Sequence, residues 1–339
     1  MIPPQIDLSD ARWFPVDLHA QGRRYGFLRI DDGVLERSSF LDTRIDARLT
    51  DAVPVDSDSL GELAVAGGQA WLFHTSFCGS TLLARVLHAP PYNVCLREPM
   101  VLRRLGDARH AGQKLGPLVS QAAALLSRRW HAGGHVVVKP THAALNVAAD
   151  LLEATPGSRA VVLTSTLDDF LVSNLKKTPE SQAKIPQLAE RAMKASGFHA
   201  RLPQGAFEPP DLLCAAVLQW AAQRELVADI VEGAGASRMR VIDMDGLLGD
   251  LLATARGVAE WLALDIPEAI LASRCRDEAG RNAKAVESSY SASKRAEESR
   301  SIEQLFADDL SRARAWATGN VLPFMRPEAL DAANHWALK

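Results

Sequence analysis

A short apolar segment followed by a loop of small residues is the feature that most constrains the fold of this chain. Residues 71–73 predict a buried strand, and residues 75–80 are small or polar apart from Phe77. Apolar side chains then recur on one face of a predicted helix: Leu82, Leu83, Val86 and Leu87. The backbone N–H groups of such a loop, together with a helix N-terminus, favour an anion. The segment is therefore either a phosphate-binding loop or an ordinary strand–loop–helix joint with Ser80 as N-cap.

The residues of the loop favour a phosphate ligand over ordinary ATP chemistry. Gly79 lets the backbone approach a ligand closely, and the hydroxyls of Ser80 and Thr81 can donate hydrogen bonds to phosphate oxygens. No lysine precedes Ser80 or Thr81, so the nucleotide-kinase signature G-x-x-x-x-G-K-[ST] is absent.

Composition limits the class of protein and its partners. With 339 residues, 47% of them hydrophobic and 23% charged, the chain predicts one large globular domain or two smaller ones. A net charge of -3 gives no reason to expect nucleic acid or an anionic membrane as partner. The N-terminus lacks the pattern of a signal peptide, and no apolar stretch has membrane-spanning length. The cysteines show no metal-ligand spacing, so we expect free thiols in the cytoplasm: Cys78, Cys95, Cys214 and Cys275. The sequence leaves the oligomeric state open.

Buried strands alternate with helices along most of the chain. Strands are predicted at residues 71–73, 93–96, 135–139, 160–164 and 238–243, and helices at 118–130, 143–154, 212–231 and 297–317. The continuous β-branched run at 136–138 is typical of a strand that is buried on both faces, as in parallel sheets. We therefore predict an α/β fold of three layers, with a mostly parallel sheet and helices on both faces.

We expect three regions. Residues 1–65 predict a small β-rich cap with strands near 13–18 and 25–30 and a turn at 31–33. Residues 38–42 either fold back towards the loop at 75–80 or serve as structural packing, and we expect packing. Residues 66–275 form the α/β core, in which the polar, proline-containing stretch 178–210 predicts a mobile cover. Residues 276–339 predict a basic loop and a helix that pack on the core.

Two predicted strands end near ionisable residues that could take part in a reaction. Glu98 follows the strand at 93–96 and precedes Pro99, which favours a helix start. It either pairs with Arg97, caps the helix, or belongs to a site at the carboxyl ends of the strands. Lys139 ends the strand at 135–139, and His142 follows closely, so a histidine that titrates near neutral pH stands beside a cation.

The loop resembles that of the sulfotransferases. The run Cys78-Gly79-Ser80-Thr81-x-Leu83 is similar to their S-G-[ST]-T-x-L motif. This resemblance implies a P-loop-like fold and 3'-phosphoadenosine 5'-phosphosulfate as co-substrate, with the loop around its 5'-phosphosulfate: Ser76, Phe77, Cys78, Gly79, Ser80 and Thr81. The family usually has Lys or Arg where this chain has Phe77.

A second stretch also resembles that family. Cytosolic members have a strand that ends in K-T-H, and here Lys139-Pro140-Thr141-His142 is similar, with one proline inserted. The resemblance implies that His142 is the general base. Because Phe77 replaces the usual basic residue, Lys139 is the best candidate to neutralise the leaving phosphate, and Glu98 is the third candidate catalytic residue.

The family's R-x-x-x-D-x-x-x-S motif has a partial counterpart at Ser165, Asp169 and Ser173. There the arginine and serine hold the 3'-phosphate, so the resemblance implies Ser165 and Ser173 as cofactor-binding residues. Members also use a late basic loop, for which Arg281 and Lys284 are the candidates here. Lys176, Lys177 and Arg281 are candidates to replace the missing charges.

These observations predict an enzyme that transfers a sulfuryl group from 3'-phosphoadenosine 5'-phosphosulfate to a hydroxyl or amine of a small-molecule acceptor. No metal-ligand pattern occurs in the sequence, and we expect no metal cofactor. The alternatives are a P-loop phosphotransferase that uses ATP and a non-catalytic nucleotide-binding protein.

Overall fold

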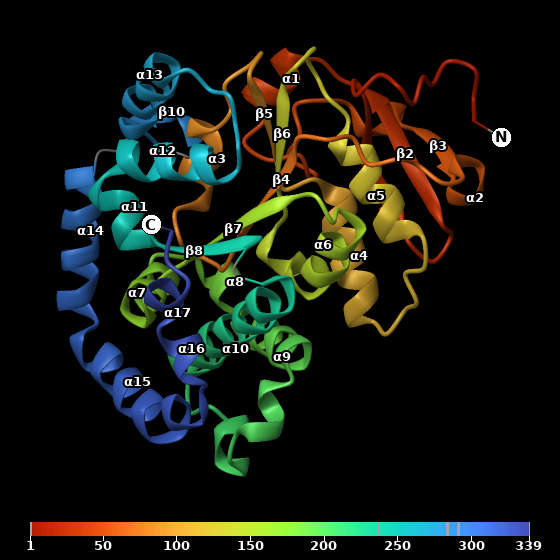
Figure 1. The fold of residues 1–339 in the computed structure, drawn as a ribbon. Helices are drawn as coiled ribbons and strands as arrows, with labels where there is room; N and C mark the ends of the chain where they lie inside the picture. The colour runs from red at the N-terminus through yellow and green to blue at the C-terminus, as the bar shows by residue number, and fades with distance from the viewer. Residues whose placement is uncertain (1, 236, 283–284, 290–291, 339) are drawn as a thin grey trace. The chain divides into compact units, whose positions relative to one another are not determined.

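The structure is a computed structural model that describes residues 2–235, 237–282, 285–289 and 292–338 (Figure 1). Five strands form one sheet in the order β5-β6-β4-β7-β8. Their bounds are β4 Gln69–His74, β5 Asn93–Arg97, β6 His135–Lys139, β7 Arg159–Thr164 and β8 Met239–Asp243. Strand β6 pairs in parallel with both β4 and β5. The sheet is flanked by helices, so the predicted α/β fold is confirmed, and all five strands lie where the sequence predicts them.

The chain forms two compact units, each made of separate segments. The first unit comprises Met1–His74, Ser80–Val161 and Asp250–Ser289. The second comprises Thr75–Gly79, Val162–Gly249 and Tyr290–Lys339.

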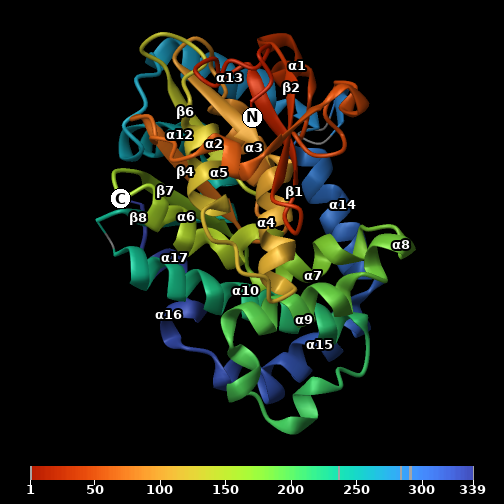
Figure 2. The same ribbon diagram turned by 90° about the vertical axis from the view of Figure 1, so that its right-hand side faces the viewer.

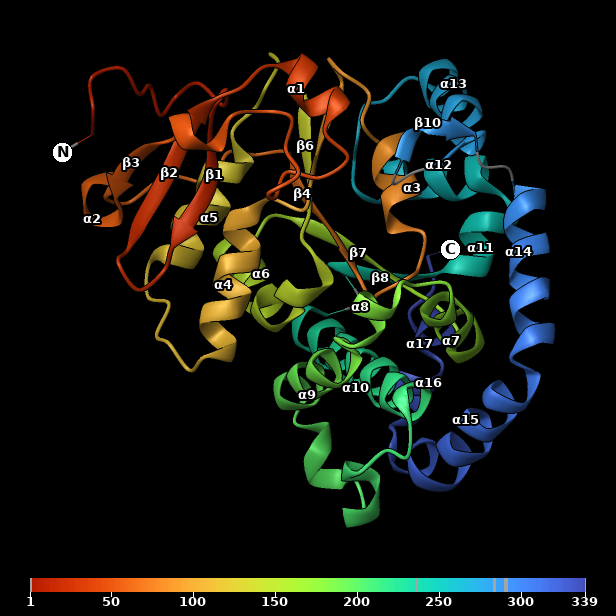
Figure 3. The same ribbon diagram turned by 180° about the vertical axis from the view of Figure 1, so that it is seen from behind.

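The N-terminal part of the first unit is a separate antiparallel sheet in the order β1-β2-β3. Its strands are β1 Trp13–His19, β2 Arg24–Arg29 and β3 Val53–Asp56, and α4 (Met100–His110) and α5 (Leu118–Ser127) pack against β1 (Figure 3). The predicted strands are correct, but the predicted turn at 31–33 is wrong. Asp31 accepts a hydrogen bond from Val34 N and caps helix α1 (Asp32–Arg37), a role for which aspartate is among the preferred residues.

Helix α3 of the first unit follows the predicted loop and contacts the parallel strands β4 and β5. It also packs against α13, a helix that was not predicted from the sequence. The helix predicted at 143–154 begins as a 3₁₀ helix, η2, and continues as α6. The bounds are α2 Ser57–Leu60, α3 Ser80–Val86, η1 Leu49–Asp51, η2 His142–Val147, α6 Ala148–Ala154, α12 Leu251–Trp261, α13 Glu268–Ala279, β9 Arg281–Asn282 and β10 Ala285–Ser289.

The second unit is built around α10 (Leu212–Ala234), which contacts helices from before and after it in the chain (Figure 2). Its partners are α7 (Leu167–Leu175), α9 (Ile185–Ser196), α15 (Ala307–Asn320) and α16 (Pro327–Leu330). The predicted helix at 297–317 is in fact two helices, because α14 (Ala292–Leu305) ends before α15 begins. The remaining elements are α8 Pro179–Gln182, η3 Phe198–Arg201, η4 Gln204–Phe207, α11 Met244–Gly249, η5 Leu322–Phe324 and α17 Ala332–His335.

The stretch predicted as a mobile cover, residues 178–210, contains the regular helix α9. Helix α9 packs against α10 and buries Ile185, Ala189 and Ala192, which recur at helical spacing. The polar residues between them conceal this narrow apolar stripe in the sequence.

Two further observations concern sequence predictions. All four cysteines are free, as predicted, and all four are buried. None of the helices in the described ranges combines the length and the apolar character that crossing a membrane requires.

Candidate functional site

Three neighbouring parallel strands of the first unit end beside one another and bring together a lysine, a glutamate and a histidine. Strand β4 ends at His74, β6 ends at Lys139, and Glu98 follows the last residue of β5. Lys139 Nζ donates hydrogen bonds to Glu98 Oε1 at 2.6 Å and to His74 Nε2 at 3.0 Å. Because an ammonium group only donates, His74 Nε2 is the acceptor in this arrangement. We call these three residues the strand-end cluster.

The strand-end cluster is almost enclosed by protein. The side chain of Lys139 is 0% exposed and that of Glu98 is 14% exposed. Burial raises the pKa of Glu98, but the charge and hydrogen bond of Lys139 outweigh it and lower the pKa to about 2. Glu98 is therefore an ionised partner for Lys139 at neutral pH.

Glu98 occupies an unusual backbone conformation. Its φ angle is 56°, in the left-handed region that non-glycine residues rarely adopt, and its N–H donates to Lys139 O at 2.6 Å. Two of the three interpretations from the sequence fail. Arg97 donates instead to the carbonyl oxygens of Leu35 and Ser38, and no side chain caps the helix that begins at Met100. Backbone strain of this kind is often kept at functional sites, which favours the remaining interpretation.

Residues 40–44 cover one side of the strand-end cluster. The guanidinium carbon of Arg44 lies 3.9 Å from the centre of the Phe40 ring, and Arg44 Nη2 is 3.8 Å from Glu98 Oε2. Lys139 Nζ lies 5.8 Å from the same ring. The expectation that residues 38–42 serve as packing agrees with these contacts, but the structure adds Arg44 as a second cation near Glu98.

His142 stands next to the strand-end cluster. It begins η2, and its half-buried ring meets the ring of His74 edge-on, with 6.2 Å between the ring centres. The structure thus brings together all three residues that the sequence proposed as catalytic: Glu98, Lys139 and His142.

The loop Thr75–Gly79 belongs to the second unit, where α10 and the end of β7 fix its backbone. Thr75 N donates to Leu163 O at 2.9 Å, and Ser76 N donates to Gln223 Oε1 at 3.1 Å. The side-chain amides of Gln219 and Gln223 donate to Ser76 Oγ at 3.4 and 3.3 Å. The hydroxyl of Ser76 is therefore already engaged by α10.

Two loop residues have positive φ angles, which turn the chain sharply between β4 and α3. They are Phe77 at 60° and Gly79 at 75°. The Phe77 ring packs edge-on against Phe170 with 5.3 Å between centres, and Cys78 Sγ donates to Thr75 O at 3.2 Å. A Cβ atom on Gly79 would lie 3.0 Å from Leu247 Cδ2, so a side chain there meets both strain and crowding. After the turn, Ser80 and Thr81 are buried in the first turn of α3.

The other predicted cofactor-binding residues differ in how deeply they are buried and in which element they belong to. Ser165 is fully buried, donates to Ser76 O at 3.5 Å, and accepts at its carbonyl from Trp220 Nε1 at 3.0 Å. Ser173 is half-buried on α7. Arg281 begins β9, but its side chain and the whole of Lys284 lie outside what the structure describes. Within the described ranges, no group of His, Cys, Asp and Glu side chains has an arrangement that could hold a metal ion.

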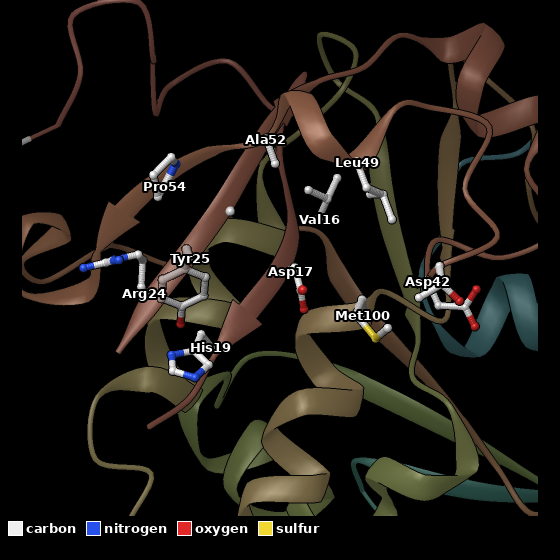
Figure 4. A pocket seen from close by; sticks show the side chains of 12 residues that line it. Val16, Asp17, His19, Arg24, Tyr25, Asp42, Leu49, Ala52, Pro54 and Met100 are labelled. Carbon is white, nitrogen blue, oxygen red and sulfur yellow. The ribbon is translucent and has the colours of Figure 1, made fainter. Parts of the chain in front are cut away.

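A cavity of about 230 Å³ lies between the N-terminal sheet and the start of α4 (Figure 4). Its lining is mixed, with polar groups from β1 and β2 beside apolar ones such as Val16, Leu49 and Met100. Asp42, which pairs with Arg44, also lines it. The cavity therefore borders the segment that covers the strand-end cluster.

Sequence reasoning missed three residues of these arrangements. His74 was available as the polar residue that directly follows the apolar run 70–73. Gln219 and Gln223 are polar residues four positions apart in a mostly apolar helix, a spacing that places them on one face.

Similar proteins of known structure exist, but the likeness is distant. No protein-family model matches the sequence, and no curated protein matches it significantly. The sulfotransferase domain from the curacin biosynthetic pathway has 13% identity and a TM-score of 0.42, covering 80% of this chain and 98% of that one. A sulfotransferase from Alicyclobacillus acidocaldarius has 15% identity and a TM-score of 0.37, covering 74% and 96%. The sulfotransferase domain of the Synechococcus PCC 7002 olefin synthase has 14% identity and a TM-score of 0.36, covering 66% and 82%.

Proposed function

We propose that the chain is a sulfotransferase that transfers a sulfuryl group from 3'-phosphoadenosine 5'-phosphosulfate to a hydroxyl or amine of a small molecule. The observation that carries the proposal is the strand-end cluster with His142 beside it. Lys139 and His142 come from the stretch that resembles the K-T-H motif, and Glu98 directly follows the neighbouring strand β5. Ligands of open α/β sheets bind at this end of the strands.

In this proposal the small-residue loop holds the 5'-phosphosulfate of the donor. The run from Ser76 to Thr81 offers backbone N–H groups, and the hydroxyls of Ser80 and Thr81 stand at the start of α3. Ser165 helps shape the loop through Ser76 O, while Ser173 is a candidate ligand of the 3'-phosphate. Arg281 and Lys284 remain candidates for the same phosphate from the sequence alone.

His142 is proposed as the general base. As the acceptor oxygen or nitrogen forms a bond to sulfur, its proton passes to the imidazole of His142, and the bond between sulfur and the bridging phosphate oxygen breaks. A base of this kind typically contributes about 100- to 10,000-fold to the rate. Adenosine 3',5'-bisphosphate leaves with the electron pair of the broken bond.

The other members of the site are proposed to act through position and charge. Glu98 neutralises Lys139, and Lys139 fixes His74, whose ring meets that of His142. Lys139 is enclosed and already paired, so we assign it to positioning, and the charge on the leaving phosphate requires another cation.

Calorimetric titration with adenosine 3',5'-bisphosphate and with ADP, each without and with magnesium, tests the donor. The proposal expects metal-independent binding that prefers the 3'-phosphorylated nucleotide. A preference for ADP with magnesium would instead favour the phosphotransferase. Nucleotide binding without transfer from radiolabelled donor to a panel of alcohols, phenols and amines would favour the non-catalytic protein.

A further inference from the structure

The loop Thr75–Gly79 contains no cationic side chain. Its residues are threonine, serine, phenylalanine, cysteine and glycine. A phosphosulfate group carries negative charge, and a charge removed from water is costly unless it is paired and hydrogen-bonded. If the loop holds this group, as the proposed function states, a cation from elsewhere in the fold has to lie against it.

Lys177 is positioned on the loop. It lies two residues beyond the end of α7, and its Nζ is 4.9 Å from the centre of the Phe77 ring. That ring is held edge-on by Phe170, a residue of α7 that is 0% exposed. The Phe77 ring thus makes a cation–π contact with Lys177 at the point where the loop turns.

The charge of Lys177 is available to a ligand. Within the described parts of the chain, Lys177 forms no ion pair with an acidic side chain. Burial lowers the pKa of Lys177, which indicates that its surroundings compensate the charge poorly. The acidic residues of α7 are engaged elsewhere, since Asp168 pairs with Arg314 and Asp169 accepts from Thr166 Oγ1.

The neighbouring lysine differs in each of these respects. Lys176 is exposed, and its Nζ donates to Ser299 Oγ at 2.7 Å. The two lysines are adjacent in sequence, and Lys177 is the one with a recorded contact to the Phe77 ring of the loop.

We infer that Lys177, in cation–π contact with the Phe77 ring, supplies the positive charge that the loop needs to hold the 5'-phosphosulfate of the donor. The same charge stabilises the 5'-phosphate as it leaves. The inference rests on the proposed function and adds to it a role for Lys177. An aromatic ring attracts a cation over its face, and the attraction strengthens when the pair is desolvated.

Calorimetry with two nucleotides tests this inference. Adenosine 3',5'-bisphosphate carries the 5'-phosphate that the loop would hold, whereas adenosine 3'-phosphate lacks it. Lys177→Met should weaken binding of the first about 10- to 100-fold, as expected for one charge-assisted hydrogen bond, and leave the second unchanged. Lys177→Arg should retain most of the affinity, and Phe77→Leu should weaken binding about two- to fivefold.

Lys194→Met, at an exposed lysine that pairs with Glu190, is the control and should bind both nucleotides as the wild type does. Thermal unfolding of each variant establishes that it is folded. If Lys177→Met binds adenosine 3',5'-bisphosphate as well as the wild type does, or loses both nucleotides equally, the inference is wrong while the proposed function stands. If the wild-type chain binds neither nucleotide, the proposed function fails, and the inference fails with it.

Discussion

Lys139 Nζ lies 2.6 Å from Glu98 Oε1, and this ion pair joins the ends of two neighbouring parallel strands. The lysine is enclosed, while the glutamate keeps 14% of its side chain exposed. Removing one partner would leave an uncompensated charge inside the protein, whereas the intact pair holds both side chains in one geometry. The pair therefore couples the stability of the sheet edge to the arrangement of the proposed site.

We expect Glu98→Gln to destabilise the protein at neutral pH. We also expect the free energy of unfolding of this variant to depend less on pH in the acid range than that of the wild type. The pKa of Glu98 in the folded protein, about 2, lies below its ordinary value of 4.5. Its ionised form therefore contributes stability above about pH 4.5, on the order of 3 kcal/mol, and this contribution is lost as the pH falls toward 2. Urea unfolding at pH values from 7 to about 3 should show the difference between variant and wild type shrinking in the acid range.

The matched control for Glu98→Gln is Glu190→Gln, which removes an exposed pair with Lys194. It should change stability by less than about 1 kcal/mol at neutral pH. A stability difference for Glu98→Gln that stays constant from neutral to acid pH would contradict the assigned pKa.

Much of the fold was predictable because its strands are short apolar runs that end in polar or turn-forming residues. The β-branched run at 136–138 marks a strand buried on both faces, and strand β6 does lie between two neighbours. Local sequence patterns predicted the structure less well in two situations. In α9, polar residues conceal a narrow apolar stripe, and elsewhere a single residue is compatible with two kinds of local structure. Asp31 suited a turn as well as a helix cap, and the cap is what forms.

The candidate site was predictable only in part, because strand order is not a local property. The sequence places Glu98 and Lys139 at strand ends, but their contact depends on β5 and β6 being neighbours. His74 joins them because β4 lies on the other side of β6. The contact between Lys177 and Phe77 could not be predicted from the sequence either, since a hundred positions separate the two residues.

We expect His142→Ala to lower the turnover of sulfuryl transfer about 100- to 10,000-fold with little change in nucleotide affinity. The half-buried ring packs against His74 at the edge of the strand-end cluster, so the fold should tolerate its loss. Steady-state kinetics and calorimetry on the same preparation separate these two effects. His135→Ala is the control, because His135 begins β6, the strand that ends at Lys139, and pairs with Asp265, and it should retain turnover. Full activity of His142→Ala would remove this histidine from the mechanism.

We expect Gly79→Ala to destabilise the protein more than Gly112→Ala does, although both glycines have a φ angle of 75°. The left-handed conformation alone costs a residue with a Cβ about 1–2 kcal/mol, and this is all that Gly112 faces, since nothing lies within 4 Å of its added Cβ. At Gly79 the Cβ also meets Leu247 Cδ2 at 3.0 Å, which adds about 1–3 kcal/mol. Urea unfolding of the two variants should show this difference, and equal losses would mean that Leu247 moves aside without cost.

We expect Glu278→Ala to destabilise the first unit by about 3–5 kcal/mol, because it breaks an enclosed ion pair. Arg85 Nε donates to Glu278 Oε2 at 2.7 Å, and the two side chains are 2% and 0% exposed. This contact ties α13 to α3, the helix that begins with Ser80 and Thr81 of the small-residue loop. Glu268→Ala on the same helix is the control, since its pair with Arg256 is exposed and should contribute less than about 1 kcal/mol. Urea unfolding of both variants measures the two losses. Similar small losses would show that Arg85 finds another partner when Glu278 is removed, and that α3 is held mainly by its apolar face.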